Sequence, residues 1–385
     1  MEKLRFGIIG MGNMGSIHAK NFASGKIENG VVTCFCDIAE ARRDFCKNTY
    51  PDIPVFATAD ELFASKLADA VIIAVPHYDH VPVAIKAFES GHAVIVEKPA
   101  SVTTKAVLEM NEAAKKSGKL FGIMFNQRTN PAYQKLREMV RSGELGRIRR
   151  IQWTITDWYR AQAYHDSAAW RSTWATEGGG ALINQNPHQL DLMQWIFGMP
   201  DKIFARLSFG KWRNIEVEDE ATIFWEYADG KTATYITSTT ETPGTNRLEI
   251  ACDMGRLVME NNKITFDRLK VSEPEFDKNN TIAFATPEME TVVYEDFDSE
   301  TAHSGIVNDF IKAYFEGTPL LANGFEGIRE MTISNAAHYS AWTGKWADVN
   351  NFPHDEFAEL LKEKAENSKK KDKVEAKVVD IEGTY

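Results

Sequence analysis

Residues 6–15 read Phe6-Gly7-Ile8-Ile9-Gly10-Met11-Gly12-Asn13-Met14-Gly15, an apolar strand-like run that leads directly into a GxGxxG motif. In such a motif the first glycine permits a tight turn, the second lets the backbone approach a pyrophosphate, and the third lets the following helix pack on the strand. The free N–H groups at the start of that helix favour an anion. A dinucleotide site also needs an acidic residue about 20 positions later, and Asp37 follows the next apolar run. The stretch therefore predicts a dinucleotide-binding fold.

Asp37 also bears on which dinucleotide is bound. A carboxylate accepts hydrogen bonds from the adenosine ribose hydroxyls and repels a 2′-phosphate. Ile38 offers nothing to a phosphate. Arg42 and Arg43, one turn into the next helix, are within reach of one in principle, but we expect them to face solvent. The sequence therefore favours NAD over NADP.

The chain has two parts that differ in their pattern of predicted strands and helices. Residues 1–125 alternate buried-type strands with helices, as in Ala70–Val75 and Ala93–Val96, which predicts a doubly wound parallel sheet of the Rossmann type. Residues 126–385 carry strands that alternate in polarity, at 148–157, 202–209, 220–227, 231–239, 247–252 and 256–260. They predict a second α/β domain, for substrate binding and oligomerisation, with an open-faced and largely antiparallel sheet. From about residue 362 the chain is rich in Lys and Glu, as expected of a charged tail.

Composition excludes several classes of function. The 385 residues have a formal net charge of −11, which argues against nucleic acid as a partner. Met1–Arg5 does not resemble a signal peptide, and no window reaches the roughly 18 apolar residues of a membrane span. The four cysteines and the histidines lack zinc-ligand spacing, so no metal is expected. These features fit a cytoplasmic protein.

Two short segments each close a parallel strand, at the sheet edge where ligands of such folds bind. They are Val75-Pro76-His77 and Glu97-Lys98-Pro99. With the downstream segments Trp170-Arg171, 178–180 (three glycines), His188 and Asp191, they resemble the glucose–fructose oxidoreductase/inositol dehydrogenase/MocA family over nearly the whole chain. The resemblance implies homodimers or homotetramers formed through the C-terminal sheet.

The family's catalytic lysine and histidine correspond to Lys98 and His188. Oxidising a secondary alcohol needs a base for the hydroxyl proton, which suits His188, and a donor for the developing alkoxide, which suits Lys98. The resemblance and the motif positions together give the residues expected at the cofactor: Gly10, Gly12, Asn13, Met14, Gly15, Asp37, Val75, Pro76, His77, His80, Glu97, Lys98, Asn126, Trp170 and Arg171.

Asn184 departs from the family pattern, because dehydrogenases of this family usually have Asp four residues before the histidine. Pro187 is a second departure, since a proline inside a helix removes a hydrogen bond. We expect a helix to restart there, with Asn186 as N-cap and Pro187 as the first helical residue. Asn184 and His188 would then not share one helix face, and Asn184 could bind a substrate hydroxyl instead.

The segment from Trp153 to Trp174 is dense in aromatic residues. Flat rings suit the apolar faces of sugars, and we expect Trp153 to lie in the core instead. The residues expected at the substrate are Trp158, Tyr159, Arg160, Tyr164 and Asn184.

Three functions remain compatible with these residues. The first is an NAD-dependent dehydrogenase of a sugar, glycoside or inositol hydroxyl. The second is an NAD-dependent glycoside hydrolase or lyase that works through transient oxidation. The third is a non-catalytic NAD- and sugar-sensing regulator, which would not need Lys98 and His188.

Overall fold

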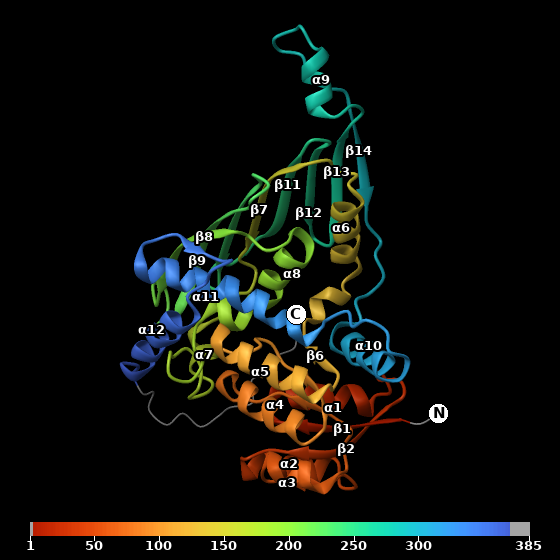
Figure 1. The fold of residues 1–385 in the computed structure, drawn as a ribbon, viewed down its shortest axis with the longest axis vertical. Helices are drawn as coiled ribbons and strands as arrows, with labels where there is room; N and C mark the ends of the chain where they lie inside the picture. Colours follow the sequence, from red (N-terminus) through yellow and green to blue (C-terminus); the bar gives the residue numbers. More distant parts are fainter. Residues whose placement is uncertain (1–2, 370–385) are drawn as a thin grey trace.

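The computed structural model describes residues 3–369, so the predicted tail beyond residue 369 lies outside the described residues. Figure 1 shows two sheets, one near each end of the molecule. The first is built from β1 (Leu4–Ile9), β2 (Gly30–Cys36), β3 (Val55–Phe56), β4 (Ala70–Ile73), β5 (Ala93–Val96) and β6 (Phe121–Ile123). All its strands are parallel, in the order β3-β2-β1-β4-β5-β6. This is the strand order of the Rossmann fold, so the predicted fold of the N-terminal part is confirmed.

Helices cover the first sheet, as expected of strands that are apolar on both faces. They are α1 (Asn13–Ala23), α2 (Glu40–Thr49), α3 (Ala59–Ser65), η1 (His77–Asp79), α4 (His80–Glu89) and α5 (Thr104–Ser117). A late helix, α10 (Ala302–Glu316), joins the same core, because the rings of Phe310 and Phe6 lie 6.3 Å apart. The predicted boundary at residue 125 stays a prediction, and α10 shows that the later chain returns to the first sheet.

The second sheet has nine strands: β7 (Ile148–Ile155), β8 (Lys202–Phe209), β9 (Glu218–Glu226), β10 (Thr232–Ser238), β11 (Asn246–Cys252), β12 (Gly255–Glu260), β13 (Lys263–Leu269), β14 (Met289–Tyr294) and β15 (Ala347–Asp348). Their order is β14-β13-β12-β11-β7-β10-β9-β8-β15. Only the β7–β10 pair is parallel, so the predicted, largely antiparallel sheet is confirmed. The last three strands in sequence, β13 to β15, were not predicted.

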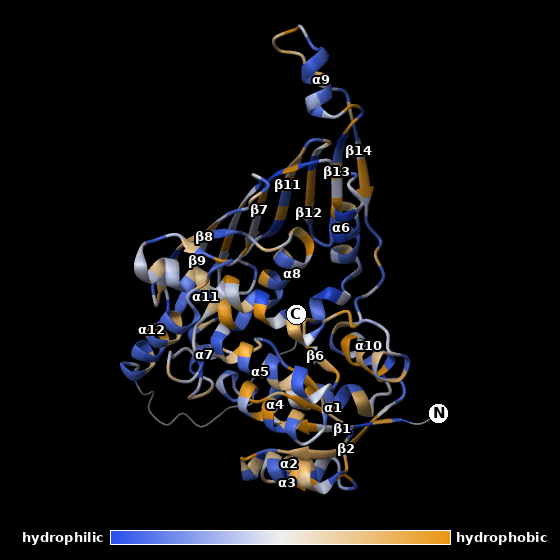
Figure 2. Ribbon diagram, in the orientation of Figure 1, coloured by the Kyte–Doolittle hydropathy of each residue, from blue (hydrophilic) through white to orange (hydrophobic). Residues whose placement is uncertain are grey.

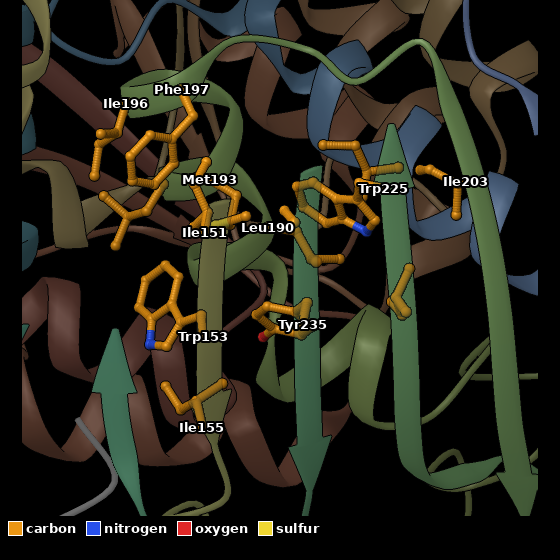
Figure 3. Packing of buried hydrophobic residues seen from close by; sticks show 14 of the residues in the cluster. Ile151, Trp153, Ile155, Leu190, Met193, Ile196, Phe197, Ile203, Trp225 and Tyr235 are labelled. Atoms are coloured by element: carbon orange, nitrogen blue, oxygen red, sulfur yellow. The ribbon is translucent and has the colours of Figure 1, made fainter. Parts of the chain in front are cut away.

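One face of this sheet packs on helices and the other stays open. The remaining helices are η2 (Asn126–Thr129), α6 (Pro131–Ser142), α7 (Gln162–His165), η3 (Ala181–Gln185), α8 (Pro187–Phe197), α9 (Glu273–Asn279), η4 (Gly324–Glu326), α11 (Gly327–Thr343) and α12 (His354–Glu366). Figure 3 shows Trp153, Tyr235 and Trp225 of adjacent strands on the side of Leu190 and Met193 of α8. Each buried side chain of this size contributes about 1.5–3 kcal/mol. Trp153 is thus a core residue, as predicted.

The open face exposes large apolar side chains, among them Phe204, Phe224 and Trp346. Association of copies through this face stays a prediction. By contrast, α9 projects beyond the end of the sheet (Figure 1), is largely hydrophilic (Figure 2) and has no buried residue. No helix within residues 3–369 combines the length and apolar character needed to cross a membrane.

Candidate active site

The glycine motif builds the first wall of the site. Gly10 has φ 91°, and a Cβ there would lie 2.5 Å from the carbonyl oxygen of Ala74. A Cβ on Gly15 would lie 1.9 Å from the carbonyl oxygen of Gly10, so this glycine permits helix α1 to pack on the turn. A Cβ on Gly12 would meet nothing within 4 Å, which leaves the backbone open to a ligand. The first turn of α1 carries no acidic residue and can receive a pyrophosphate.

Asp37 lies beside this turn, at the end of β2. Its two carboxylate oxygens accept hydrogen bonds from the backbone N–H of Met11 (2.7 Å) and of Ala39 (2.8 Å). Each oxygen keeps a lone pair for a ribose hydroxyl. The residues therefore fit an NAD molecule with its adenosine ribose at Asp37.

Of the two arginines near Asp37, Arg43 is turned toward the backbone and not to solvent, so the expectation was wrong for Arg43. Arg43 Nη1 donates hydrogen bonds to the carbonyl oxygens of Asp37 (3.0 Å) and Ile38 (2.7 Å). Arg42 lines the same cavity as Asp37. The guanidinium of Arg43 fixes the turn after β2, and Arg42 forms part of the cavity wall near Asp37.

A cavity of about 660 Å³ runs from this turn to the start of α8. It brings together Lys98, His188 and all but two of the other predicted site residues. The two exceptions are Gly15 and Tyr159. Gly15 lies behind the turn. Tyr159 is 44% exposed, and its ring lies 5.4 Å from the guanidinium of Arg213. The placement of Tyr159 weakens its expected role at the substrate.

The loops after β4 and β5 are joined by His80. Its Nδ1 lies 2.7 Å from the carbonyl oxygen of Pro99, and its Nε2 lies 2.8 Å from that of Val75. Burial lowers the pKa of His80, although both carbonyl contacts oppose this shift. Because backbone groups occupy both ring nitrogens, His80 holds the loop that carries Lys98.

Glu97 is fixed from the other side, by α1. Its Oε1 lies 2.7 Å from Nε2 of His18, and both side chains are buried. Burial would raise the pKa of Glu97, but the hydrogen bond and charge of His18 hold it below its usual value. The Glu97 carboxylate in turn partly offsets the effect of burial on Lys98, whose pKa is lowered.

Lys98 and His188 meet in the inner part of the cavity. Lys98 Nζ donates a hydrogen bond of 2.8 Å to the carbonyl oxygen of Asn184. His188 is 6% exposed, and its Nδ1 has no hydrogen-bond partner among the described residues. Burial, followed by the charges of Lys98 and His303, keeps the pKa of His188 well below its usual value. This shift favours the neutral imidazole, which is the form that a general base needs before it takes a proton.

Asn184 does not partner His188. A π-helical turn, η3, ends before Asn186, and α8 begins at Pro187 as predicted. The Asn184 side-chain amide donates instead to Glu177 Oε1 (2.5 Å) and to the hydroxyl of Tyr164 (3.2 Å). Burial raises the pKa of Glu177 to about 7.

Aromatic rings and arginines form the outer wall. The hydroxyl of Tyr164 accepts hydrogen bonds from Arg171 Nη1 (2.6 Å) and Gln185 Nε2 (3.2 Å). The Arg171 guanidinium lies 4.5 Å from the Trp170 ring, and that of Arg160 lies 5.8 Å from the Trp158 ring. These planar groups present both apolar faces and hydrogen-bond donors to the cavity.

Sequence reasoning missed several residues of the site. Gln127, Gln185 and His303 line the cavity, and Glu177 supports Asn184 from behind. His303 comes from α10, far along the chain, and carries no local motif. Gln185 stands next to Asn184 and could have been identified from that position.

Comparison with known proteins agrees with this geometry. Residues 4–125 match the family model "Oxidoreductase family, NAD-binding Rossmann fold", and residues 133–258 match "GFO/IDH/MocA C-terminal domain". The putative oxidoreductase YteT of Bacillus subtilis is 29% identical over 45% of this chain and 42% of its own length. The myo-inositol 2-dehydrogenase of Thermotoga maritima is 24% identical over 88% of this chain and 96% of its own length.

The first curated relatives are matched over about half of their own length, 42–58%. Among solved structures, the WlbA dehydrogenase of Bordetella pertussis, in complex with NADH and UDP-GlcNAcA, has a TM-score of 0.77 at 22% identity. It covers 90% of this chain and 98% of its own, and at that identity it supports the fold alone. With its NAD-binding Rossmann domain and its matching C-terminal domain, the chain belongs to the Gfo/Idh/MocA family of oxidoreductases.

Proposed function

We propose that the protein is an NAD-dependent dehydrogenase that oxidises a secondary hydroxyl of a sugar, glycoside or inositol. The observation that carries this proposal is that one cavity contains the cofactor turn, the Lys98–His188 pair and the aromatic wall of Trp158 and Tyr164. Bound NAD supplies the hydride acceptor. Neutral His188 takes the hydroxyl proton, and Lys98 stabilises the oxygen as negative charge develops on it.

The direct test is to incubate the protein with NAD and a panel of monosaccharides, glycosides and inositols, and to follow NADH by absorbance. Stoichiometric NADH from a member of the panel supports the proposal. Release of an aglycone without net NADH would instead indicate the lyase or hydrolase reaction. Binding of sugar with neither product would indicate a sensor.

Asp37→Ala is expected to weaken NAD binding roughly 10- to 100-fold, because hydrogen bonds to a charged acceptor contribute about 1.5–3 kcal/mol. It should also relax discrimination against NADP, since Arg42 lines the same region. Calorimetric titration with each dinucleotide measures both effects, and Asp44→Ala on the exposed side of α2 is the control. Tighter binding of NADP than NAD by the unmodified protein would contradict the assignment.

Asn184→Asp is expected to leave the acid limb of the kcat/KM profile in place, because Asn184 contacts Glu177 and Tyr164 and not His188. The new carboxylate would face Glu177, whose pKa burial already raises to about 7. The two would share a proton at low pH and repel each other once it is lost, so activity should fall on the alkaline side.

Asn184→Ala is the matched control, since it removes the same amide without adding charge. Profiles of kcat/KM against pH for both variants show whether a carboxylate at position 184 affects Glu177 or His188. An acid limb moved upward by about 1–3 pH units in Asn184→Asp alone would show that the carboxylate acts on His188 after all.

A further inference from the structure

A second cavity, of about 350 Å³, lies between η2, the start of α8 and the ends of β7 and β11. It adjoins the first cavity, because Gln127 and Trp158 line both. His188 and Gln189 are neighbours in the first turn of α8, and they line the first and the second cavity respectively. A ring held at His188 would therefore have the second cavity next to it, across Gln127 and Trp158.

The walls of the second cavity are rich in side-chain amides. Gln189 is 2% exposed, lines this cavity, and its Oε1 has no hydrogen-bond partner among the described residues. Leaving such a buried oxygen without a partner costs about 1–3 kcal/mol. Asn246 is held in place by the indole N–H of Trp153, which donates to its Oδ1 at 3.1 Å. Gln189 and Asn246 thus place two side-chain amides in the wall of this cavity.

The charge of the residues that line the second cavity further restricts the chemical class of ligand that can bind there. Asp157, Glu260 and Glu300 line it, and none of the described lining residues is Lys or Arg. An anionic group such as a phosphate would face these carboxylates without a counter-charge. Carboxylates and amides are good acceptors for hydroxyl groups, and the rings of Tyr133 and Trp158 offer apolar faces. The cavity thus suits a neutral, polyhydroxylated group.

We propose that this second cavity is a subsite for a second sugar ring, so that the substrate is a neutral two-ring glycoside and not a free monosaccharide, an inositol or a nucleotide sugar. The inference rests on the proposed dehydrogenase function, because the first ring must lie at Lys98 and His188. The link between the rings would pass Gln127 and Trp158, which line both cavities.

The first experiment compares matched substrates at saturating NAD: a monosaccharide, its methyl glycoside and disaccharides that contain the same reacting ring. At least one disaccharide is expected to have kcat/KM about 10-fold or more above the methyl glycoside, which corresponds to the roughly 1.4 kcal/mol of one or two hydrogen bonds. Equal values across the series would overturn the inference while leaving the dehydrogenase proposal intact.

The second experiment removes the acceptors. Asp157→Ala combined with Glu300→Ala should reduce the ratio of kcat/KM between disaccharide and methyl glycoside towards one. Both residues lie at the outer rim, Asp157 being exposed and Glu300 half-buried, so folding should be retained. The matched control is Glu295→Gln, which removes an exposed carboxylate on the neighbouring segment that pairs with Lys263 and should leave the ratio unchanged.

Calorimetry separates the two proposals. Disaccharide should bind the NADH-loaded protein about 10-fold more tightly than the methyl glycoside, and the double variant should lose this difference. If no sugar in the panel is oxidised but the disaccharide preference in binding persists and depends on Asp157 and Glu300, the dehydrogenase proposal fails, and the second cavity binds a sugar ring without being a substrate subsite. If a nucleotide sugar binds more tightly than every disaccharide, the subsite proposal is wrong.

Discussion

His188→Ala is expected to lower kcat by about 10²–10⁴-fold, the usual contribution of a positioned general base. The cause is the loss of the proton acceptor in the inner part of the cavity, where burial and the charge of Lys98 keep the imidazole neutral. Lys98→Met should lower kcat/KM by about 10²–10³-fold, as the loss of a donor to a developing oxyanion does. The double variant should cost much less than the product of the two, because the residues act on one oxygen.

Neither variant should change NAD affinity by more than a small factor, since the adenosine half is held at Asp37 and the glycine turn. Steady-state kinetics with a sugar that the panel identifies, together with calorimetric titration of NAD, measures both quantities. Lys105→Met and His354→Ala serve as controls, because both side chains lie outside the cavity. Near-normal turnover in His188→Ala would move the base elsewhere, with Tyr164 the next candidate.

The N-terminal domain was predictable because its signals are local. The glycine turn, Asp37 and the apolar strands each occupy a few consecutive residues, and their spacing alone implies the parallel sheet. The segment around Lys98 was identifiable for the same reason, since the carboxyl end of a strand is where a ligand lies.

The rest of the site depends on contacts between distant segments. His303 reaches the cavity from α10. Glu177 accepts a hydrogen bond from the Asn184 side chain, and the turn that brings these two residues together has no repeating sequence pattern that would predict it. Tyr159 does not line the cavity, and the sequence did not predict this because an aromatic-rich segment does not tell which side each ring takes. The π-helical turn η3 aims Asn184 away from His188, and only the break at Pro187 hinted at this.

Asp191 is part of the family pattern in the sequence. The structure shows that it forms a buried ion pair with Arg128, which the sequence alone did not predict. Its carboxylate accepts two hydrogen bonds from Arg128, at 2.8 Å from Nε and 2.7 Å from Nη2, and both side chains are 1% exposed. Arg128 Nη1 also donates to Glu326 (2.5 Å) and to the carbonyl oxygen of Leu321 (2.9 Å). This arginine joins η2 to α8, the helix that carries His188.

Arg128→Ala is therefore expected to destabilise the protein by about 3–5 kcal/mol, because it leaves the Asp191 carboxylate buried without a counter-charge. Combining Arg128→Met with Asp191→Leu should cost less than Arg128→Ala alone, since it also removes the fully buried Asp191 charge, while the partly exposed Glu326 keeps its ion pair with Arg329. Urea unfolding followed by tryptophan fluorescence gives the stabilities, and Arg141→Ala on α6 is the control.

The two variants also separate stability from function. Gln194 Nε2 donates to Asp191 at 2.7 Å on the same helix, so the paired replacement loses this contact but keeps α8 packed. We expect it to retain NAD binding and most of its turnover, whereas Arg128→Ala should lose turnover as α8 loosens around His188. If the paired replacement were less stable than Arg128→Ala, the buried pair would be a net source of stability and the argument from uncompensated charge would be wrong.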